Sequence, residues 1–202
     1  MEKSSISAIL YISSMLDIYL VQMEVLDGQK AKNFDTVRRL TSEIRKLPED
    51  PVPGLIILPE MFATGYLPLH PEKSAEDFST YTSGDTTIFL SRLANTTGCT
   101  VMGAGISQAA NGDLFNHTSV YNPGAQTETA CYDKCHPFFI EQSKISAGHK
   151  VNLFKIRQWK VAPTICFDLR FPELYREAVK QGAQLATIQA AWPEKRIHHW
   201  KT

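Results

Sequence analysis

Short apolar segments in this chain alternate with segments of helical periodicity. Residues 55–58 form an unbroken apolar run of strand length, which is typical of a strand covered on both faces. Such a strand needs packed layers above and below it, so the chain is expected to fold as stacked sheets with helices outside. Further strands are predicted at 18–21, 99–106, 114–121, 126–134, 151–156, 160–166 and 185–189.

Turn and cap residues separate these strands. The segments Asn111-Gly112-Asp113 and Asn122-Pro123-Gly124 predict turns on either side of strand 114–121, and therefore antiparallel hairpins in the middle of the chain. Three helices are also expected. They span 33–47 with Asn33 as N-cap and Pro48 as the stop, 83–85 to about Gly98, and 171–181 with Pro172 in the first turn and Gly182 beyond the end.

The charge balance excludes several classes of partner. The 202 residues contain 21 Lys and Arg against 21 Asp and Glu, and no long run of like charge. That balance argues against nucleic-acid binding and against a polybasic membrane surface. No apolar run approaches the length of a membrane span. The partner is therefore expected to be a small molecule.

Length and cysteine content limit the possible domain organisation and location of the protein. We expect one domain at 17–202, preceded by an N-terminal extension at 1–16. Four cysteines are too few for a disulfide scaffold, and no convincing export signal precedes them, so a cytoplasmic location is expected. No G-x-G-x-x-G or P-loop is present, and no cofactor or metal is predicted.

Three segments place a reactive side chain at the end of a predicted strand. They are Leu55-Ile-Ile-Leu-Pro-Glu60-Met-Phe-Ala-Thr-Gly65-Tyr, Tyr132-Asp-Lys134-Cys-His-Pro-Phe138 and Ile165-Cys166-Phe-Asp-Leu-Arg170-Phe-Pro-Glu173. A carboxylate, an ammonium and a thiol are together the groups needed to attack an unreactive amide carbonyl. The order and spacing of the three segments carry more weight than any one of them.

These segments resemble the motifs of the nitrilase (carbon–nitrogen hydrolase) superfamily, which occur in the same order. The resemblance extends from about Asp17 to the C-terminus and includes Asn116 and Ala191-Trp192-Pro193. It implies a four-layer α-β-β-α sandwich, an amidase activity without cofactor, and a homodimer. Relatives continue beyond the segment His198–Thr202, so the domain is expected to be incomplete at its C-terminus.

The resemblance also implies roles for individual residues. Cys166 is expected to be the nucleophile, with a depressed pKa, and Glu60 the general base. Lys134 is expected to face the tetrahedral oxyanion, together with the backbone N–H of Phe167. The product of attack would be a thioester that water hydrolyses, after ammonia has left.

Four more residues are expected to support the reaction or bind substrate. Glu141 stands before Gly148 as a second family glutamate does, and is expected to orient Lys134 and the substrate amide. His136 is expected to shape the site. Arg170 would clamp a substrate carboxylate, or else pair with Asp168 or Glu173. Trp192 is expected to line the substrate site.

Several alternatives remain open. A zinc site built from Cys131, Cys135 and His136 lacks a second ligand pair. A papain-like pair of Cys166 with His117, His136, His198 or His199 lacks a papain-type signature. A third alternative is an inactive fragment or scaffold of the same fold.

Substrate identity also stays open. The segment Cys-Phe-Asp-Leu-Arg-Phe-Pro-Glu and Ala-Trp-Pro look closest to omega-amidases, which act on 2-oxo-dicarboxylate monoamides such as 2-oxoglutaramate. Nitriles, N-carbamoyl compounds and deaminated glutathione are the alternatives.

Overall fold

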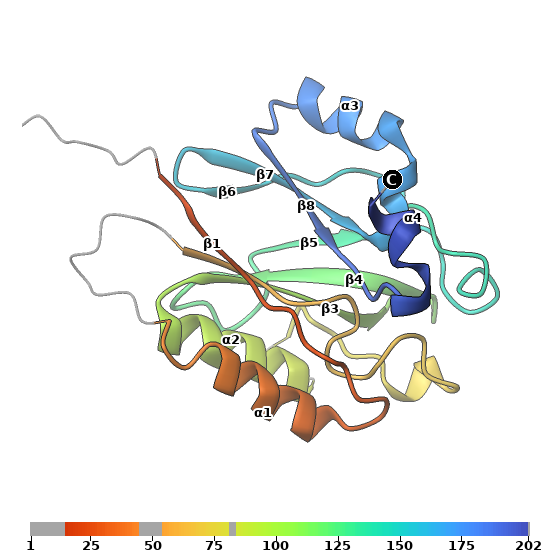
Figure 1. Cartoon of the computed structure of the whole chain (residues 1–202), viewed down its shortest axis with the longest axis horizontal. Helices are drawn as coiled ribbons and strands as arrows, with labels where there is room; N and C mark the ends of the chain where they lie inside the picture. The colour runs from red at the N-terminus through yellow and green to blue at the C-terminus, as the bar shows by residue number, and fades with distance from the viewer. Residues whose placement is uncertain (1–14, 45–53, 81–83, 202) are drawn as a thin grey trace, which may run out of the picture.

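The structure is a computed structural model that describes residues 15–44, 54–80 and 84–201. Residues 1–14 of the expected N-terminal extension, Pro48 and Ser83 lie outside the described residues. Figure 1 shows two sheets packed face to face, with helices covering both outer faces.

The larger sheet contains five strands in the order β1-β2-β3-β4-β5. Its first three strands run parallel, and the β3-β4-β5 pairs are antiparallel, as the predicted turns require. The smaller sheet contains three strands in the order β6-β7-β8, of which β7 and β8 are parallel. The strands are β1 (Asp17–Leu20), β2 (Gly54–Ile57), β3 (Thr100–Gln108), β4 (Leu114–Tyr121), β5 (Ala130–Asp133), β6 (Phe154–Ile156), β7 (Trp159–Ile165) and β8 (Leu185–Gln189).

Helices cover the outside of each sheet. Helices α1 and α2 lie against the five-stranded sheet, and α3 lies against the three-stranded one (Figure 1). Three short 3-10 turns complete the described elements. The helices and turns are α1 (Lys30–Leu40), η1 (Pro71–Lys73), α2 (Asp85–Thr97), η2 (Cys166–Arg170), α3 (Pro172–Lys180), η3 (Glu194–Arg196) and α4 (Ile197–Lys201).

Three apolar clusters hold the layers together. The first joins α1 and α2 to the five-stranded sheet, through side chains such as Phe34 and Leu90. The second lies between the two sheets and includes Leu55 of β2 and Val161 of β7. The third packs α3 onto the smaller sheet, with Leu174 among its members. Layers of helix, sheet, sheet and helix follow from these contacts, so the predicted α/β four-layer sandwich is confirmed.

The expected boundaries of the first helix are wrong. Helix α1 begins at Lys30, so Asn33 lies inside it and is not its cap. The Asn33 side chain instead bonds the backbone of Leu26 at 2.8 and 2.9 Å and the carbonyl of Ala63 at 3.1 Å. The helix ends at Leu40 because the Thr41 hydroxyl donates to the Val37 carbonyl at 2.8 Å and begins a turn.

Three strands also differ from the prediction. Strand β6 begins at Phe154 rather than at 151. Strand β5 begins at Ala130 rather than near 126, since bends occupy residues 126–129. Strand β7 ends at Ile165, and Cys166 begins the turn η2. The end of α3 is as predicted: Gly182 has φ of +89°, and the N–H of Ala183 bonds the carbonyl of Ala178 at 2.9 Å.

Membrane insertion finds no support in the described part of the chain. Within it, no helix has the length and apolar character needed to cross a bilayer.

Candidate active site

Three strand ends bring the expected reactive side chains together. Glu60 follows β2, Lys134 follows β5 and Cys166 follows β7. The backbone N–H of Lys134 bonds the carbonyl of Asn116 at 2.9 Å, which continues the β4-β5 pairing to the base of the lysine side chain. The two sheets therefore each supply part of one cluster.

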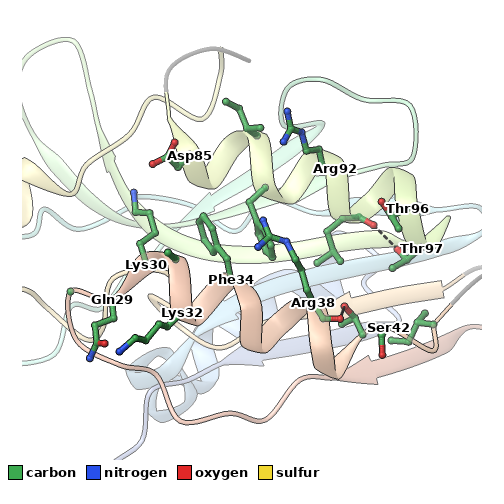
Figure 2. A pocket seen from close by; sticks show the side chains of 17 residues that line it. Gln29, Lys30, Lys32, Phe34, Arg38, Ser42, Asp85, Arg92, Thr96 and Thr97 are labelled. Atoms are coloured by element: carbon green, nitrogen blue, oxygen red, sulfur yellow. Dashed lines mark hydrogen bonds between the residues drawn. The ribbon is translucent and has the colours of Figure 1, made fainter.

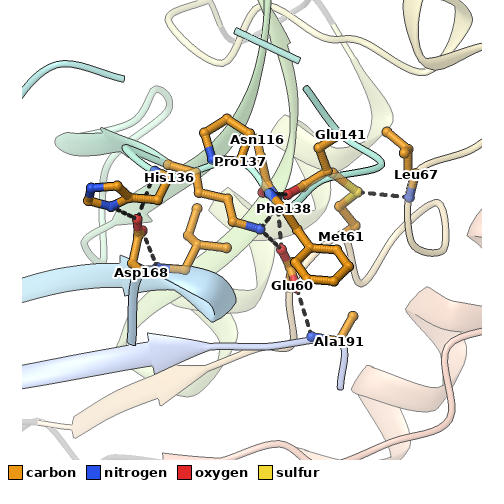
Figure 3. Close-up of polar contacts among 12 residues, drawn as sticks. Glu60, Met61, Leu67, Asn116, His136, Pro137, Phe138, Glu141, Asp168 and Ala191 are labelled. Carbon is orange, nitrogen blue, oxygen red and sulfur yellow. Dashed lines mark hydrogen bonds and ion pairs between the residues drawn. The ribbon is translucent and has the colours of Figure 1, made fainter. Parts of the chain in front are cut away.

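The lysine lies between two carboxylates (Figure 3). Its Nζ is 2.9 Å from Oε1 of Glu60 and 2.7 Å from Oε2 of Glu141. All three side chains are completely buried. Burial alone lowers the pKa of the Lys134 ammonium, but the two carboxylates outweigh it and raise the pKa above its ordinary value. The lysine is therefore a fixed cation at neutral pH.

Asn116 joins the same cluster from β4. Its Nδ2 donates to Oε1 of Glu60 and to Oε1 of Glu141, both at 2.8 Å. Because ionised carboxylates only accept hydrogen bonds, the amide nitrogen must face them. Asn116 therefore fixes the separation of the two glutamates. The resemblance included this asparagine, but no role was predicted for it.

The second oxygen of Glu60 faces the other sheet. Its Oε2 accepts a hydrogen bond from the backbone N–H of Ala191 at 2.8 Å, just after β8 (Figure 3). The same carboxylate lies close enough to the Cys166 thiol to raise its pKa. Glu60 thus contacts both the ammonium and the thiol, which is the geometry that a shared general base requires.

The backbone at Cys166 is strained. Its φ of +46° lies in the left-handed region that side chains other than glycine rarely adopt. The positive φ turns the chain sharply from β7 into η2 and sets the thiol apart from the strand. Residues in such conformations persist only where surrounding contacts hold them, and they occur often at functional sites.

The expected depression of the Cys166 pKa is wrong for this resting site. Burial raises the pKa of the thiol, and the Glu60 carboxylate raises it further, while the Lys134 ammonium lowers it by less. The two glutamates and the one lysine already carry an excess negative charge. The thiol is therefore protonated at neutral pH and must lose its proton during attack.

Asp168 holds the turn that carries Cys166. Its Oδ2 accepts from the Tyr132 hydroxyl at 2.7 Å and from the N–H of Ile165 at 3.0 Å. Its Oδ1 accepts from the N–H and from Nδ1 of His136, each at 2.9 Å. This completely buried carboxylate therefore ties the nucleophile turn to the segment that carries Lys134. The sequence analysis had considered it only as a partner for Arg170.

Aromatic side chains gather around the turn that carries Cys166. The ring of Phe167 makes edge contacts with Phe138 and Phe171, at centroid distances of 5.2 and 5.4 Å. The His136 ring stacks on Phe171 at a centroid distance of 3.6 Å. Phe167 is also the second residue of η2, where backbone N–H groups have no acceptor within the turn.

The loop after Lys134 is tied back to the cluster. Oε2 of Glu141 accepts a hydrogen bond from the N–H of Phe138, and the N–H of Gly148 bonds the carbonyl of Lys134 at 2.8 Å. A Cβ at Gly148 would collide with the carbonyl of Asp133, so glycine is required there. Glu141 and Gly148 therefore both hold the loop after Lys134 in place, one through its carboxylate and the other through its backbone.

Tyr66 is a site residue that the sequence reasoning missed. It ends the first motif, and its hydroxyl is hydrogen bonded to Glu141. Burial and the carboxylates of Glu141 and Glu60 raise its pKa, so it stays a neutral phenol. Its position as the last residue of the quoted motif was the only signal in the sequence.

Arg170 and Trp192 lie together beside the C-terminal segment. The Arg170 guanidinium is exposed and donates to the carbonyl of His199 at 2.5 Å, and it lies 5.9 Å from the Trp192 ring. The indole N–H of Trp192 donates to the carbonyl of Arg196 at 2.7 Å, and the ring contacts Trp200. Trp192 packs against the apolar cluster that includes Cys166, and no ion pair of Arg170 occurs among the described residues.

The rival sites are not favoured by the geometry. His136 pairs with Asp168, and His117 pairs with Asp133 at 2.6 Å, whereas Cys166 pairs with Glu60. Among the described residues, possible metal-ligand atoms lie close together at His117, Glu128 and Cys131. The predicted combination of Cys131, Cys135 and His136 does not form such a group. A pocket of about 990 Å³ between α1 and α2 contains none of the acid–base residues (Figure 2).

The fold and site define a class: a two-sheet α/β protein that places a carboxylate, an ammonium and a thiol at the ends of three strands. The chain belongs to the carbon–nitrogen hydrolase family, whose sequence model matches residues 18–202. It is thus a member of the nitrilase superfamily.

Relatives of known name support this assignment. The chain is 28% identical over 188 residues to the 2-oxoglutaramate amidase of Bacillus subtilis, and 34% identical over 151 residues to the hydrolase in the agr operon of Staphylococcus lugdunensis. These matches cover 92% and 73% of this chain. They span 68% of the first relative and 62% of the second.

A solved structure matches over the same part. The carbon–nitrogen hydrolase superfamily protein XC1258 of Xanthomonas campestris superimposes with a TM-score of 0.77 at 28% identity. The match covers 92% of this chain and 68% of that chain.

Proposed function

We propose that this chain is a cysteine-dependent amidase that hydrolyses a small-molecule amide through a thioester, releasing ammonia and a carboxylate. One observation carries the proposal: the Glu60 carboxylate contacts both the Lys134 ammonium and the Cys166 thiol. The acid–base group, the cation and the nucleophile of an acyl transfer thus meet in one water-excluded cluster.

Attack begins from the protonated thiol. As Sγ of Cys166 forms a bond to the amide carbon, its proton moves to Glu60, so that no free thiolate has to exist beforehand. The negative charge moves to the carbonyl oxygen. There the Lys134 ammonium and the N–H of Phe167 stabilise it, and such a donor is worth about 2.7–4 kcal/mol.

Breakdown returns the same proton. Glu60 gives it to the departing nitrogen, the C–N bond breaks, and ammonia leaves a thioester on Cys166. Glu60, again a carboxylate, then takes a proton from water as the water oxygen attacks the thioester carbon. As the second tetrahedral intermediate collapses, the C–S bond breaks and Glu60 returns its proton to the Cys166 sulfur. The released acid then loses its own proton to solvent and leaves as a carboxylate.

Glu141 acts through the lysine. The Glu141 carboxylate holds the Lys134 ammonium in position and balances its positive charge. Asn116 in turn fixes the position of Glu141 relative to Glu60. A fixed cation costs no reorganisation when the oxyanion forms. Glu141 is therefore assigned a positioning role.

A 2-oxo-dicarboxylate monoamide is the proposed substrate. The names of the relatives 2-oxoglutaramate amidase and omega-amidase support this choice. Arg170 is the proposed partner of the distal carboxylate, since its guanidinium is exposed and its contacts are with the His199 carbonyl and the Trp192 ring rather than with a carboxylate of the described residues. Substrate binding would then replace the contact with His199 by a bidentate one.

Ammonia release across an amide panel tests the proposal. The panel contains 2-oxoglutaramate, neutral amides, a nitrile, an N-carbamoyl compound and deaminated glutathione. Cys166→Ala should abolish release, whereas Cys131→Ser, at a partly buried cysteine on the face of β5 opposite to Lys134, should retain it. A thioester adduct on Cys166, seen by mass spectrometry after rapid quenching, supports the intermediate. Turnover by Cys166→Ala, or none by the parent chain, would contradict the proposal.

The substrate arm is tested separately. Arg170→Lys should raise KM for acidic amides and leave neutral amides unchanged, because lysine lacks the planar fork. Equal losses on both kinds of amide would exclude the clamp.

We also propose a homodimer in the cytoplasm. Sedimentation of the purified chain and fractionation of the source cells test these two points.

A further inference from the structure

A second cluster of ligand-type side chains lies on the opposite face of the strands that carry Asn116 and Lys134. His117 of β4 pairs directly with Asp133 of β5, and Ser119 pairs with Cys131. Because side chains alternate along a strand, these four residues share one face, and Asn116, Tyr132 and Lys134 belong to the other. Glu128, just before β5, reaches the same face.

The contacts within this outer cluster are short. Nδ1 of His117 lies 2.6 Å from Oδ1 of Asp133, and Nε2 lies 2.9 Å from Oε2 of Glu128. The Ser119 hydroxyl donates to Oε2 of Glu128 at 2.8 Å, and the same carboxylate lies close enough to the Cys131 thiol to raise its pKa. One ligand atom each from His117, Glu128 and Cys131 lies within 4.8 Å of the others.

The cluster is ordered on its inner side and open on its outer side. His117 is buried and its ring stacks against Phe78 at 5.3 Å. Cys131 is partly exposed, and the Asp133 side chain is 37% exposed. An ion could thus enter past Cys131 and Asp133, and meet an imidazole that packing already holds in place.

We propose that His117, Glu128 and Cys131 bind a divalent transition-metal ion, with Zn²⁺ as the best fit, while Asp133 orients the imidazole. An imidazole nitrogen, a thiolate and a carboxylate oxygen are the three ligand types that Zn²⁺ takes in proteins. A carboxylate on the second ring nitrogen, here 2.6 Å away, is the usual partner of a metal-bound histidine. Water or the Ser119 hydroxyl would fill the fourth position.

The spacing is compatible with such an ion. Tetrahedral Zn²⁺, with bonds of about 2.0–2.3 Å, places its ligand atoms about 3.3–3.8 Å apart. The 2.9 Å contact between His117 and Glu128 must widen by a few tenths of an ångström, and the Cys131 sulfur must move inward. A partly exposed cysteine at the edge strand β5 can make that movement by a side-chain rotation.

Protons occupy the ligand positions in the metal-free cluster. Burial lowers the pKa of His117, but Asp133 and Glu128 outweigh it and raise the pKa to about 9. Burial and the same two carboxylates raise the pKa of Cys131 to about 11, against a small opposing effect of Lys150. A bound ion needs a Cys131 thiolate and a His117 Nε2 without its proton, so metal binding is expected to release protons.

Metal titration of the full chain tests the proposal. The chain is freed of metal with a chelator and titrated with Zn²⁺ by calorimetry in buffers of different ionisation enthalpy. Binding of one ion with release of protons is expected near neutral pH. Titration with Co²⁺ should produce the ultraviolet charge-transfer band of a thiolate–cobalt bond, which imidazole and carboxylate ligands alone do not give.

Matched variants locate the site. Cys131→Ser should abolish the charge-transfer band and weaken binding more than 100-fold, whereas Cys135→Ser should change neither. Asp133→Asn should weaken binding about 10–100-fold with the band retained, as expected for a residue that orients a ligand. Circular dichroism of each variant checks that it is folded.

Two outcomes would overturn the proposal. Absence of Zn²⁺ binding above micromolar affinity by the folded parent chain would mean that the cluster only holds an imidazolium between carboxylates. Equal binding by the parent and Cys131→Ser would place the ion on exposed imidazoles such as His149, and His117→Gln would then also leave binding unchanged.

Discussion

The two faces of the β4-β5 pair carry two charged clusters of different character. On the inner face, Glu60, Glu141 and Lys134 are completely buried, and Lys134 contacts both carboxylates. On the outer face, His117 takes the place of the lysine between two carboxylates, one of which is 37% exposed. The arrangement of charges is similar, but the surroundings differ.

That difference in burial decides what each cluster can do. A permanent cation in a dry site is fixed and cannot leave, so it can stabilise an oxyanion without rearrangement. An imidazolium near solvent can lose its proton, and another cation can take its place. Side-chain alternation within one strand pair thus separates a fixed charge from an exchangeable one.

Removing the general base should have the largest effect on the inner cluster. Glu60→Gln keeps the shape but cannot accept the thiol proton, so turnover should fall about 10²–10⁴-fold. The same change removes a cause of the raised Cys166 pKa, so ultraviolet titration should find a lower thiolate pKa than in the parent. Lower turnover with an unchanged or higher thiol pKa would contradict the assigned contact.

Removing the buried cation should have the next largest effect. Lys134→Met leaves two buried carboxylates without a cation, and should cost about 3–5 kcal/mol of unfolding free energy. Urea denaturation measures this loss. The matched control Lys155→Met, at an exposed lysine of β6, should change stability by less than about 0.5 kcal/mol. Similar values for both variants would contradict the buried ion cluster.

The strand-end residues were predictable because their signals are local. Glu60, Lys134 and Cys166 each stand in a contiguous motif that follows an apolar strand, and the structure brings Glu60 into contact with the other two. Their catalytic roles remain a prediction. The layered fold followed from the same strand and helix pattern, and is confirmed.

Features that depend on register or burial were not predictable. Asn33 looks like a helix cap, but it bonds the distant carbonyl of Ala63, which no local pattern reveals. The raised pKa of Cys166 depends on its burial and on the orientation of Glu60. The outer cluster depends on the pairing of His117 with Asp133, so the sequence predicted no metal site there.

A smaller effect is expected at the carboxylate that ties the two sheets. Asp168→Asn loses acceptors for donors such as the Tyr132 hydroxyl and the N–H of Ile165, and should cost about 2–3 kcal/mol of stability. As a positioning residue it should lower kcat, with a smaller change in KM, and should slow alkylation of Cys166. Asp113→Asn, at an exposed turn, is the control. Unchanged kcat would limit Asp168 to a structural role.

The smallest effect concerns the pH dependence of stability, which should depend on the protonation of His117 in the outer cluster. Since the His117 pKa is raised to about 9 in the folded chain, its stabilising contribution is fully present below about pH 6.5 and is lost as pH rises through about 9. Because Asp133 is partly exposed, we expect a loss of about 1–2 kcal/mol rather than the full value of the shift. Urea denaturation from pH 6 to 9.5 should show this slope in the metal-free parent, and a flatter one in His117→Gln. Saturating Zn²⁺ should stabilise the parent more at the alkaline end, where fewer protons have to leave, and so oppose the slope. An identical slope in the parent and in His117→Gln would mean that protonation of His117 does not contribute to the stability of the chain over this pH range.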